Sequence, residues 1–292
     1  MRATALALVA TVMSGLFAQV AVGAAKRPSI GAYKGLGCWV DIYEDKAFKN
    51  PEAAVKDMAS HGVRTLYLET GNSRSKTAIV NPSAQARFIR AAHARKMKVV
   101  AWYLPDLKNV DSDYKRIAAA IKFRTSDGQR FDSFALDIES SAVKSVSTRN
   151  ARLASLTKRI RKLAGRSYPL GAIIPSPVGI SKNSGYWKSF PYKSLAASYD
   201  VFVPMSYYTY HGKGAAAAKS DTLANIRIIR SQPGCKTIPI HMIGGIADNS
   251  SDAETKAFVN ATQKARCNGA SFYSWTGTSA ADWKALRAVK AR

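Results

Sequence analysis

The sequence predicts a single closed barrel of eight parallel strands, each followed by a helix, the arrangement known as a TIM barrel. Apolar segments of strand length alternate with amphipathic helical segments along the chain, which is typical of parallel α/β folds. The strand segments are apolar on both faces, as expected for strands that are buried on both sides. No glycine-rich phosphate loop follows the first strand, which disfavours the alternative, an open doubly wound sheet.

The strands are identified by apolar runs that end at turn or helix signals. They are expected at residues 36–43, 63–69, 98–104, 131–140, 168–174, 200–207, 237–243 and 270–275.

Capping signals mark the helix starts. Asn50-Pro51 and Asn81-Pro82 each place a capping side chain before a proline at the first helical position, and Ser251 to Glu254 reads as a capping box. The clearest helix spans residues 149–165, where leucine and isoleucine recur at helical spacing before a glycine. Other helices are expected at 51–61, 82–96, 111–123, 216–230, from 251 onward and at 279–290, with a long irregular excursion at 178–198.

The first residues are not expected to belong to the fold. Residues 1–25 combine a positive start, an apolar run and small residues at the end, which predicts a secretory signal peptide. A membrane anchor is the alternative, although the run is near the lower length for a spanning helix. Residues 26–34 form a basic linker and 35–292 the barrel domain, so we expect a secreted or cell-wall-associated protein that is not integral to a membrane.

The net charge of +25 predicts anionic partners. The lysines and arginines are spread over many segments instead of forming one arm or stripe, so no specific nucleic-acid site is predicted. For an exported protein, an anionic cell-wall polymer is the partner that this charge favours.

The three cysteines allow at most one internal disulfide. Cys235 precedes the seventh strand and Cys267 the eighth, and neighbouring strands begin side by side at the bottom of a barrel. We therefore predict a Cys235–Cys267 bond, whereas Cys38 lies inside the first strand as a small buried residue.

The fourth strand carries the first candidate site. Asp137 and Glu139 are two residues apart, so both side chains point the same way, with Cα atoms roughly 6.5 Å apart. A second carboxyl nearby raises the pKa of one of the pair, which suits a general acid that works near neutral pH. A solvated pair of carboxylates at a strand end is the alternative interpretation.

The carboxyl ends of the other strands add acids and aromatic side chains to the same rim. Aromatic faces stack on sugar rings, and carboxyl groups bind hydroxyls or protonate a glycosidic oxygen, so the rim predicts a polysaccharide substrate. The substrate-binding candidates are Asp41, Tyr43, Glu69, Trp102, Met205, Tyr208 and Trp275.

Other chemistries fit the sequence poorly. The four histidines lack metal-ligand spacing, no G-x-S-x-G elbow occurs, and no cofactor is predicted. His241, in the seventh strand, is interpreted as a hydrogen-bonded core residue and not as a base.

Residues 132–139, DSFALDIE, resemble the D-G-x-D-x-D-x-E signature of chitinase-type glycoside hydrolases, with Ser133 in place of the glycine and Ala135 in place of the middle aspartate. Met205-Ser206-Tyr207 is similar to the M-x-Y motif of that family, and residues 271–275 are similar to its last strand. The resemblance implies Glu139 as general acid, Asp137 as the residue that orients the 2-acetamido group, Tyr207 as its hydrogen-bond partner and Trp275 as the floor of the site.

A second resemblance is to muramidase-type lysozymes, which combine an aspartate after the first strand with D-x-E at the fourth. Asp41 with Asp137 and Glu139 fits this plan and implies peptidoglycan as the substrate. Both resemblances lead to a secreted glycosidase acting on an N-acetylated glycan. The alternative is a catalytically inactive barrel that binds wall or matrix polysaccharide, which the departures at Ser133 and Ala135 favour.

Overall fold

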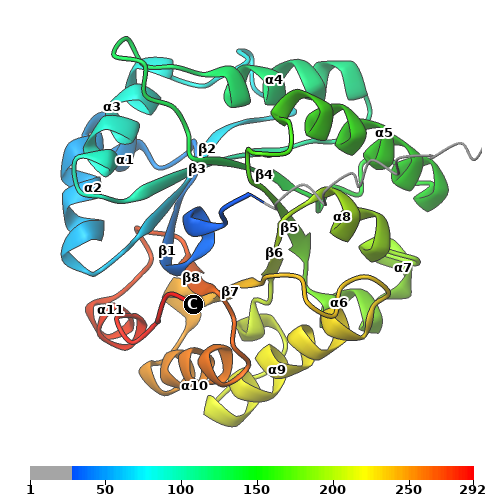
Figure 1. The fold of residues 1–292 in the computed structure, drawn as a ribbon. Helices are drawn as coiled ribbons and strands as arrows, with labels where there is room; N and C mark the ends of the chain where they lie inside the picture. Colours follow the sequence, from blue (N-terminus) through cyan, green and yellow to red (C-terminus); the bar gives the residue numbers. More distant parts are fainter. Residues whose placement is uncertain (1–27) are drawn as a thin grey trace, which may run out of the picture.

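The computed structural model describes residues 28–292, so the expected signal peptide and the first residues of the expected linker lie outside it. Eight parallel strands form a closed barrel in chain order, and the helices surround it (Figure 1). The predicted fold class is thereby confirmed. The strands are β1 (Gly35–Val40), β2 (Thr65–Asn72), β3 (Lys98–Leu104), β4 (Ser133–Asp137), β5 (Leu170–Pro175), β6 (Val201–Met205), β7 (His241–Ile246) and β8 (Gly269–Tyr273).

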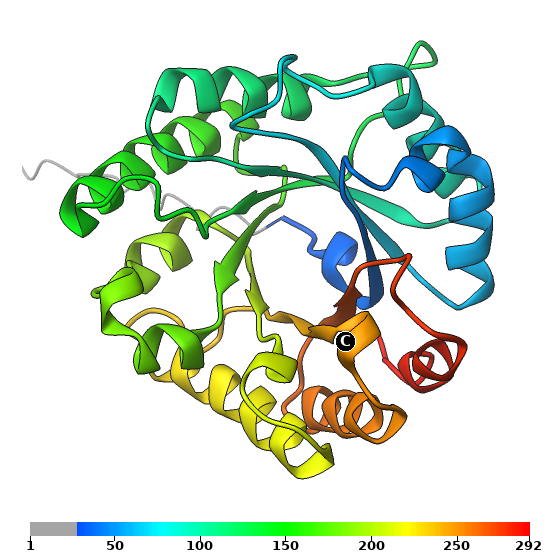
Figure 2. The same ribbon diagram turned by 180° about the vertical axis from the view of Figure 1, so that it is seen from behind.

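The outer layer consists of α-helices that follow the strands (Figures 1 and 2). Asn50 and Asn81 cap α2 and α3 as predicted, and Ser251 with Glu254 forms the capping box of α10. The helices are α1 (Asp45–Lys49), α2 (Pro51–Ser60), α3 (Pro82–His93), α4 (Val110–Lys122), α5 (Val146–Ala164), α6 (Pro177–Lys182), α7 (Ser184–Trp187), α8 (Tyr192–Ser198), α9 (Ala215–Ser231), α10 (Asp252–Lys264) and α11 (Ala280–Leu286).

Several segments differ from expectation. The fourth strand ends at Asp137 instead of residue 140, and the eighth ends at Tyr273 instead of residue 275. The excursion at 178–198 is not irregular, because α6, α7 and α8 occupy most of it. The seventh strand begins at His241 instead of residue 237, since Pro239 has no amide hydrogen to donate to a ladder. Only an isolated bridge between Ile240 and Phe202 precedes it.

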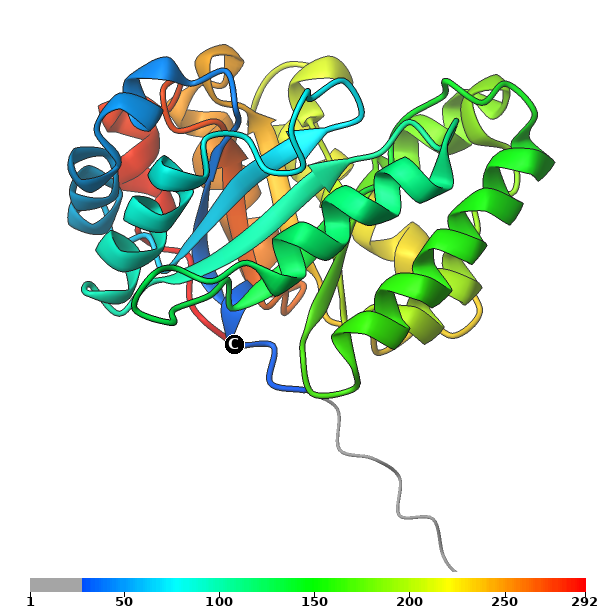
Figure 3. The ribbon, with the colours of Figure 1, turned by 90° about the horizontal axis from the view of Figure 1, so that it is seen from above.

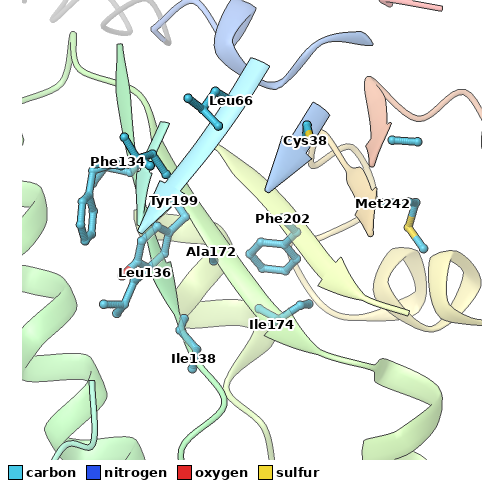
Figure 4. Close-up of a cluster of buried hydrophobic side chains, with 14 of the residues drawn as sticks. Cys38, Leu66, Phe134, Leu136, Ile138, Ala172, Ile174, Tyr199, Phe202 and Met242 are labelled. Atoms are coloured by element: carbon cyan, nitrogen blue, oxygen red, sulfur yellow. The ribbon is translucent and has the colours of Figure 1, made fainter. Parts of the chain in front are cut away.

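Strand alternation divides the core into two layers. Side chains that point outward pack between the strands and the helices, among them Leu66, Phe134, Leu136 and Phe202 (Figure 4). Side chains that point inward fill the barrel and form a separate cluster, which includes Trp39, Tyr67, Val100, Trp102, Ala135, Ile173, Val203 and Met205. The interior is therefore packed below the mouth, as in other barrels of this kind.

A short 3-10 helix, η1 (Gly31–Tyr33), closes the amino-terminal end of the barrel. The Tyr33 hydroxyl lies 2.6 Å from Oγ of Ser133, and the Tyr33 carbonyl oxygen lies 3.0 Å from Nδ1 of His241. Burial lowers the pKa of His241 to about 4, so the ring is neutral and acts as the predicted hydrogen-bonded core residue. The carboxyl terminus lies at this same end (Figure 3), where the amide of Arg292 bonds to the carbonyl of Asn268.

The predicted Cys235–Cys267 disulfide is wrong, because all three cysteines, Cys38 included, are free and buried. The Sγ atom of Cys235 lies 3.7 Å from the carbonyl oxygen of Tyr192 and 3.7 Å from that of Pro233. The thiol thus faces the start of α8 and not the segment that leads into β8.

No helix within residues 28–292 has both the length and the apolar character that crossing a bilayer requires.

The packing at the base of β8 predicts that Gly269 tolerates no side chain. An added Cβ would lie 2.4 Å from the carbonyl oxygen of Gly35 and 2.4 Å from Nδ1 of His241. We expect Gly269→Ala to lower the free energy of unfolding by about 2 kcal/mol or more, because backbone would have to shift. Gly31→Ala is the matched control, since its Cβ would meet only Ser29 Oγ at 3.6 Å. Urea unfolding measures both; equal effects would contradict the prediction.

Candidate active site

Four carboxyl groups come from the carboxyl-terminal ends of β1, β2 and β4. Glu69 and Asp137 belong to the strands themselves, whereas Asp41 and Glu139 lie just beyond strand ends. Every second side chain of a strand points into the barrel. Asp41, Glu69 and Asp137 each come two residues after an inward residue, namely Trp39, Tyr67 and Ala135, so they also point inward. These groups therefore gather at the mouth of the barrel.

Asp137 and Glu139 lie together at the carboxyl end of β4. The Asp137 side chain is buried, and its Oδ1 accepts no hydrogen bond from the described residues. Burial raises the pKa of Asp137 well above that of a free aspartate, and the charges of Glu139 and Glu69 raise it further. Burial also raises the pKa of Glu139. Both groups thus hold protons more tightly than free carboxyls do.

Two tyrosines lie against this pair. Tyr207 follows β6 in the left-handed region, with φ of 42°, and the pKa of its hydroxyl is raised by burial and then by the charges of Asp137 and Glu139. Tyr186, in α7, donates a hydrogen bond to the backbone oxygen of Glu139. Burial raises the pKa of Tyr186, and the charges of Glu139 and Asp137 add to the rise. The excursion therefore contributes one wall of the site.

Glu69 is held on the β1 side of the mouth. Its Oε2 accepts the amide hydrogen of Ile42 at 3.0 Å, and its Oε1 accepts from Nδ2 of Asn72 at 3.2 Å. Burial raises the pKa of Glu69 to about 7, and the hydrogen bonds from Ile42 and Asn72 offset only part of this rise. Glu69 thus titrates near neutral pH.

Asp41 pairs with an aromatic residue that the sequence prediction missed. The Tyr273 hydroxyl donates to Oδ2 of Asp41 at 2.5 Å, and the Tyr273 ring lies 6.5 Å from that of Trp39. Tyr43 lies on the rim with 65% of its surface exposed, and its hydroxyl accepts from Nδ2 of Asn72 at 3.0 Å. The β1–β8 side of the mouth therefore offers a tyrosine pair and a carboxylate to a ligand.

The inner wall below these groups is aromatic. Trp102 on β3 packs edge-on against Trp39 at 5.8 Å, and Trp39 stacks on Tyr67 at 4.2 Å. Met205 on β6 belongs to the same inward cluster. Trp102 and Met205 are thus buried parts of the floor and wall, and the Trp102 Nε1 hydrogen finds no acceptor among residues 28–292.

Two predicted site residues lie elsewhere. Tyr208 points outward, because it follows Tyr207 directly; its ring lies 5.8 Å from Phe258, and its hydroxyl lies 2.7 Å from Oγ of Ser250. Trp275 is not the floor of the site. Its Nε1 donates to Oδ2 of Asp57 at 2.8 Å, which places the indole against α2 on the outside of the barrel. Tyr273, two residues earlier on β8, occupies the inward position instead.

The described residues contain no cluster of three histidine, cysteine, aspartate or glutamate side chains that could hold a metal ion. The mouth can instead donate protons from carboxyls with raised pKa values, accept hydrogen bonds, and stack aromatic rings on a ligand.

No family model matches the chain, and no curated protein matches it either. Solved structures do. The endo-β-1,4-mannanase from Thermotoga petrophila is 10% identical with a TM-score of 0.67, covering 88% of this chain and 76% of that one. A class V chitinase from Pseudomonas fluorescens is 12% identical with a TM-score of 0.63, covering 87% and 99%. A chitinase from Chromobacterium violaceum is 11% identical with a TM-score of 0.60, covering 87% and 98%. At these identities the likeness establishes the fold: this chain has the TIM barrel that chitinases and mannanases have.

The raised pKa of Glu69 predicts a pH-dependent stability difference. Between the usual glutamate pKa of 4.5 and the folded value of about 7, the unfolded chain releases the proton while the folded chain keeps it. Stability is therefore lost as pH rises through this window, on the order of 3 kcal/mol at most. We therefore expect the free energy of unfolding of Glu69→Gln, minus that of the unmodified chain, to increase as the pH rises from 4 to 8. Urea unfolding at each pH measures this difference.

Glu52→Gln is the control for this experiment, since the hydrogen bond from Arg87 lowers the pKa of the Glu52 carboxyl. That carboxylate stabilises the fold above the unfolded pKa, so its variant should lose relative stability as pH rises. A pH-independent difference for Glu69→Gln would contradict the assignment.

Proposed function

We propose that this chain is a secreted glycoside hydrolase that cleaves an N-acetylated glycan, chitin or peptidoglycan, with Glu139 as the general acid. The main support is the buried pair of Asp137 and Glu139 at the mouth of the barrel, with both pKa values raised and two tyrosine hydroxyls beside them. A general acid must hold its proton at the working pH, and burial supplies this property to Glu139.

In this proposal the glycosidic oxygen takes the Glu139 proton as its bond to the anomeric carbon breaks. The carbonyl oxygen of the substrate's own 2-acetamido group attacks that carbon, and water later opens the resulting ring. Asp137 Oδ1, which accepts no hydrogen bond within the described chain, would accept the acetamido N–H. The Tyr207 hydroxyl would donate to the acetamido oxygen; the charges of both acids raise its pKa, which supports this role.

Ala135 has a consequence for this mechanism. It lies in the inward cluster directly before Asp137 on the same face, so no carboxyl stands there to exchange a proton with Asp137. Glu69 is the other carboxylate whose charge acts on Asp137. Asp137 therefore depends on burial and on Glu69, together with Glu139, for its raised pKa.

Two alternatives have particular support. Asp41 at the β1 end, bound to Tyr273, fits the muramidase plan and so favours peptidoglycan over chitin. The apolar residue at Ala135 favours a catalytically inactive barrel that binds wall or matrix polysaccharide. Export, predicted from residues 1–25, is part of the proposal, and an anionic wall would retain a protein with a net charge of +25.

Glu139→Gln tests the catalytic proposal. The substitution keeps the size of the side chain and removes its transferable proton, so release of reducing ends from chitin oligomers or peptidoglycan should fall by ~10²–10⁴-fold. Glu52→Gln, an exposed glutamate outside the mouth, should keep full activity. Binding of the same oligomers is measured in parallel. Absence of release from both polymers by the unmodified chain, with binding retained, would favour the inactive barrel.

A further inference from the structure

Trp275 forms part of a pocket on the outer flank of the barrel. The pocket has a volume of about 490 Å³ and lies between α1, α2 and the segment after β8. These parts are neighbours on one side of the barrel, and α11 lies beside them (Figure 1). The guanidinium of Arg287, just after α11, donates to the carbonyl of Ser60 in α2. The lining residues are Lys46, Lys49, Asn50, Ala53, Ala54, Asp57 and Trp275.

The pocket has an apolar wall. The indole of Trp275 and the side chains of Ala53 and Ala54 form this wall, and the hydrogen bond from Trp275 Nε1 to Asp57 fixes the orientation of the indole. A ring held in this way is a platform for the apolar face of a sugar. The amide nitrogen of Asn50 can donate to a hydroxyl, because only its Oδ1 is used to cap α2.

Two lysines make the rest of the lining positively charged. Lys46 places its Nζ 5.7 Å from the centroid of a Trp275 ring, and Lys49 lines the same pocket. Neither ammonium group forms an ion pair with a carboxylate in the described part of the chain. The single lining acid is engaged, since Asp57 Oδ2 accepts from Trp275 and Oδ1 lies 3.6 Å from Nε2 of His61. The pocket therefore presents two unpaired cations beside an aromatic platform.

We propose that this pocket is a second glycan-binding site, specific for an acidic sugar whose ring stacks on Trp275 and whose carboxylate lies between Lys46 and Lys49. Neutral sugars would use the aromatic platform alone and bind more weakly. The site is separate from the mouth, and it requires no hydrolysis. It is close to the mouth, because Trp275 follows Tyr273 by two residues, so a bound acidic polymer would hold the barrel mouth next to the wall material.

Binding is tested with tetragalacturonate as the acidic probe and chitotetraose as the neutral one, in a Glu139→Gln background that prevents turnover. Calorimetry and Trp fluorescence measure affinity. We expect the pair Lys46→Gln and Lys49→Gln to weaken tetragalacturonate binding about 5-fold or more, with less effect at high salt. Trp275→Ala should weaken it as well, and the lysine pair remains informative if Trp275→Ala fails to fold.

The matched control is the pair Lys158→Gln and Lys162→Gln, exposed residues on α5 that remove the same charge. An equal loss in the control pair would mean attraction to the basic surface in general and would overturn the proposal. No loss of tetragalacturonate affinity in the Lys46 and Lys49 pair would also overturn it, as would an equal loss of chitotetraose affinity in that pair. Because all variants carry Glu139→Gln, failure of the proposed hydrolase activity leaves this result interpretable.

Discussion

The mouth of the barrel is governed by the burial of carboxyl groups that form no ion pair within residues 28–292. The chain has 44 lysines and arginines, yet within residues 28–292 none forms an ion pair with Asp41, Glu69, Asp137 or Glu139. Burial makes ionisation of Glu69, Asp137 and Glu139 costly, so the pKa values of these three carboxyls are raised. A nearby arginine would stabilise the fold and, by the same interaction, would remove the acid that the proposed chemistry needs.

The amino-terminal end of the barrel instead holds a network of neutral hydrogen-bonded groups. At the opposite end, Tyr33 reaches Ser133, and His241 is held neutral between the Tyr33 carbonyl and Ser271 Oγ. Trp39 also donates to Ser271 Oγ at 2.8 Å. The polar groups of this network have partners, whereas the Tyr67 hydroxyl, the Trp102 Nε1 hydrogen and Oδ1 of Asp137 have none among residues 28–292. Asp137 lies at the mouth, where a ligand can supply the missing donor.

Where the strands are regular, the alternation of residues predicted correctly which side chains point into the barrel. Alternation placed Asp137 beside Glu139 and Glu69 on the inner face, and it also separates Tyr207, which faces the acids, from Tyr208, which packs against Phe258. Alternation applied to β6 would have excluded Tyr208 from the site. Alternation could not have excluded Trp275, because Trp275 is two residues after the inward Tyr273. The strand β8 ends at Tyr273, and the chain then turns outward. Where a strand ends depends on packing that the local pattern does not contain.

The residues outside the strands were harder to predict for the same reason. Tyr186 reaches the acids because α7 places its hydroxyl against the backbone oxygen of Glu139. Cys235 is free because its thiol faces the carbonyl oxygen of Tyr192 at the start of α8. Both outcomes depend on contacts between segments far apart in sequence. The displacement of Trp275 has the most consequence, because it leaves the floor of the mouth to Tyr273, bound to Asp41, and it moves the large aromatic surface to a flank with two lysines. An acidic mouth and a basic aromatic flank therefore lie within a few residues of each other, so the two surfaces should select opposite kinds of group: hydrogen-bond donors at the mouth and carboxylates at the flank.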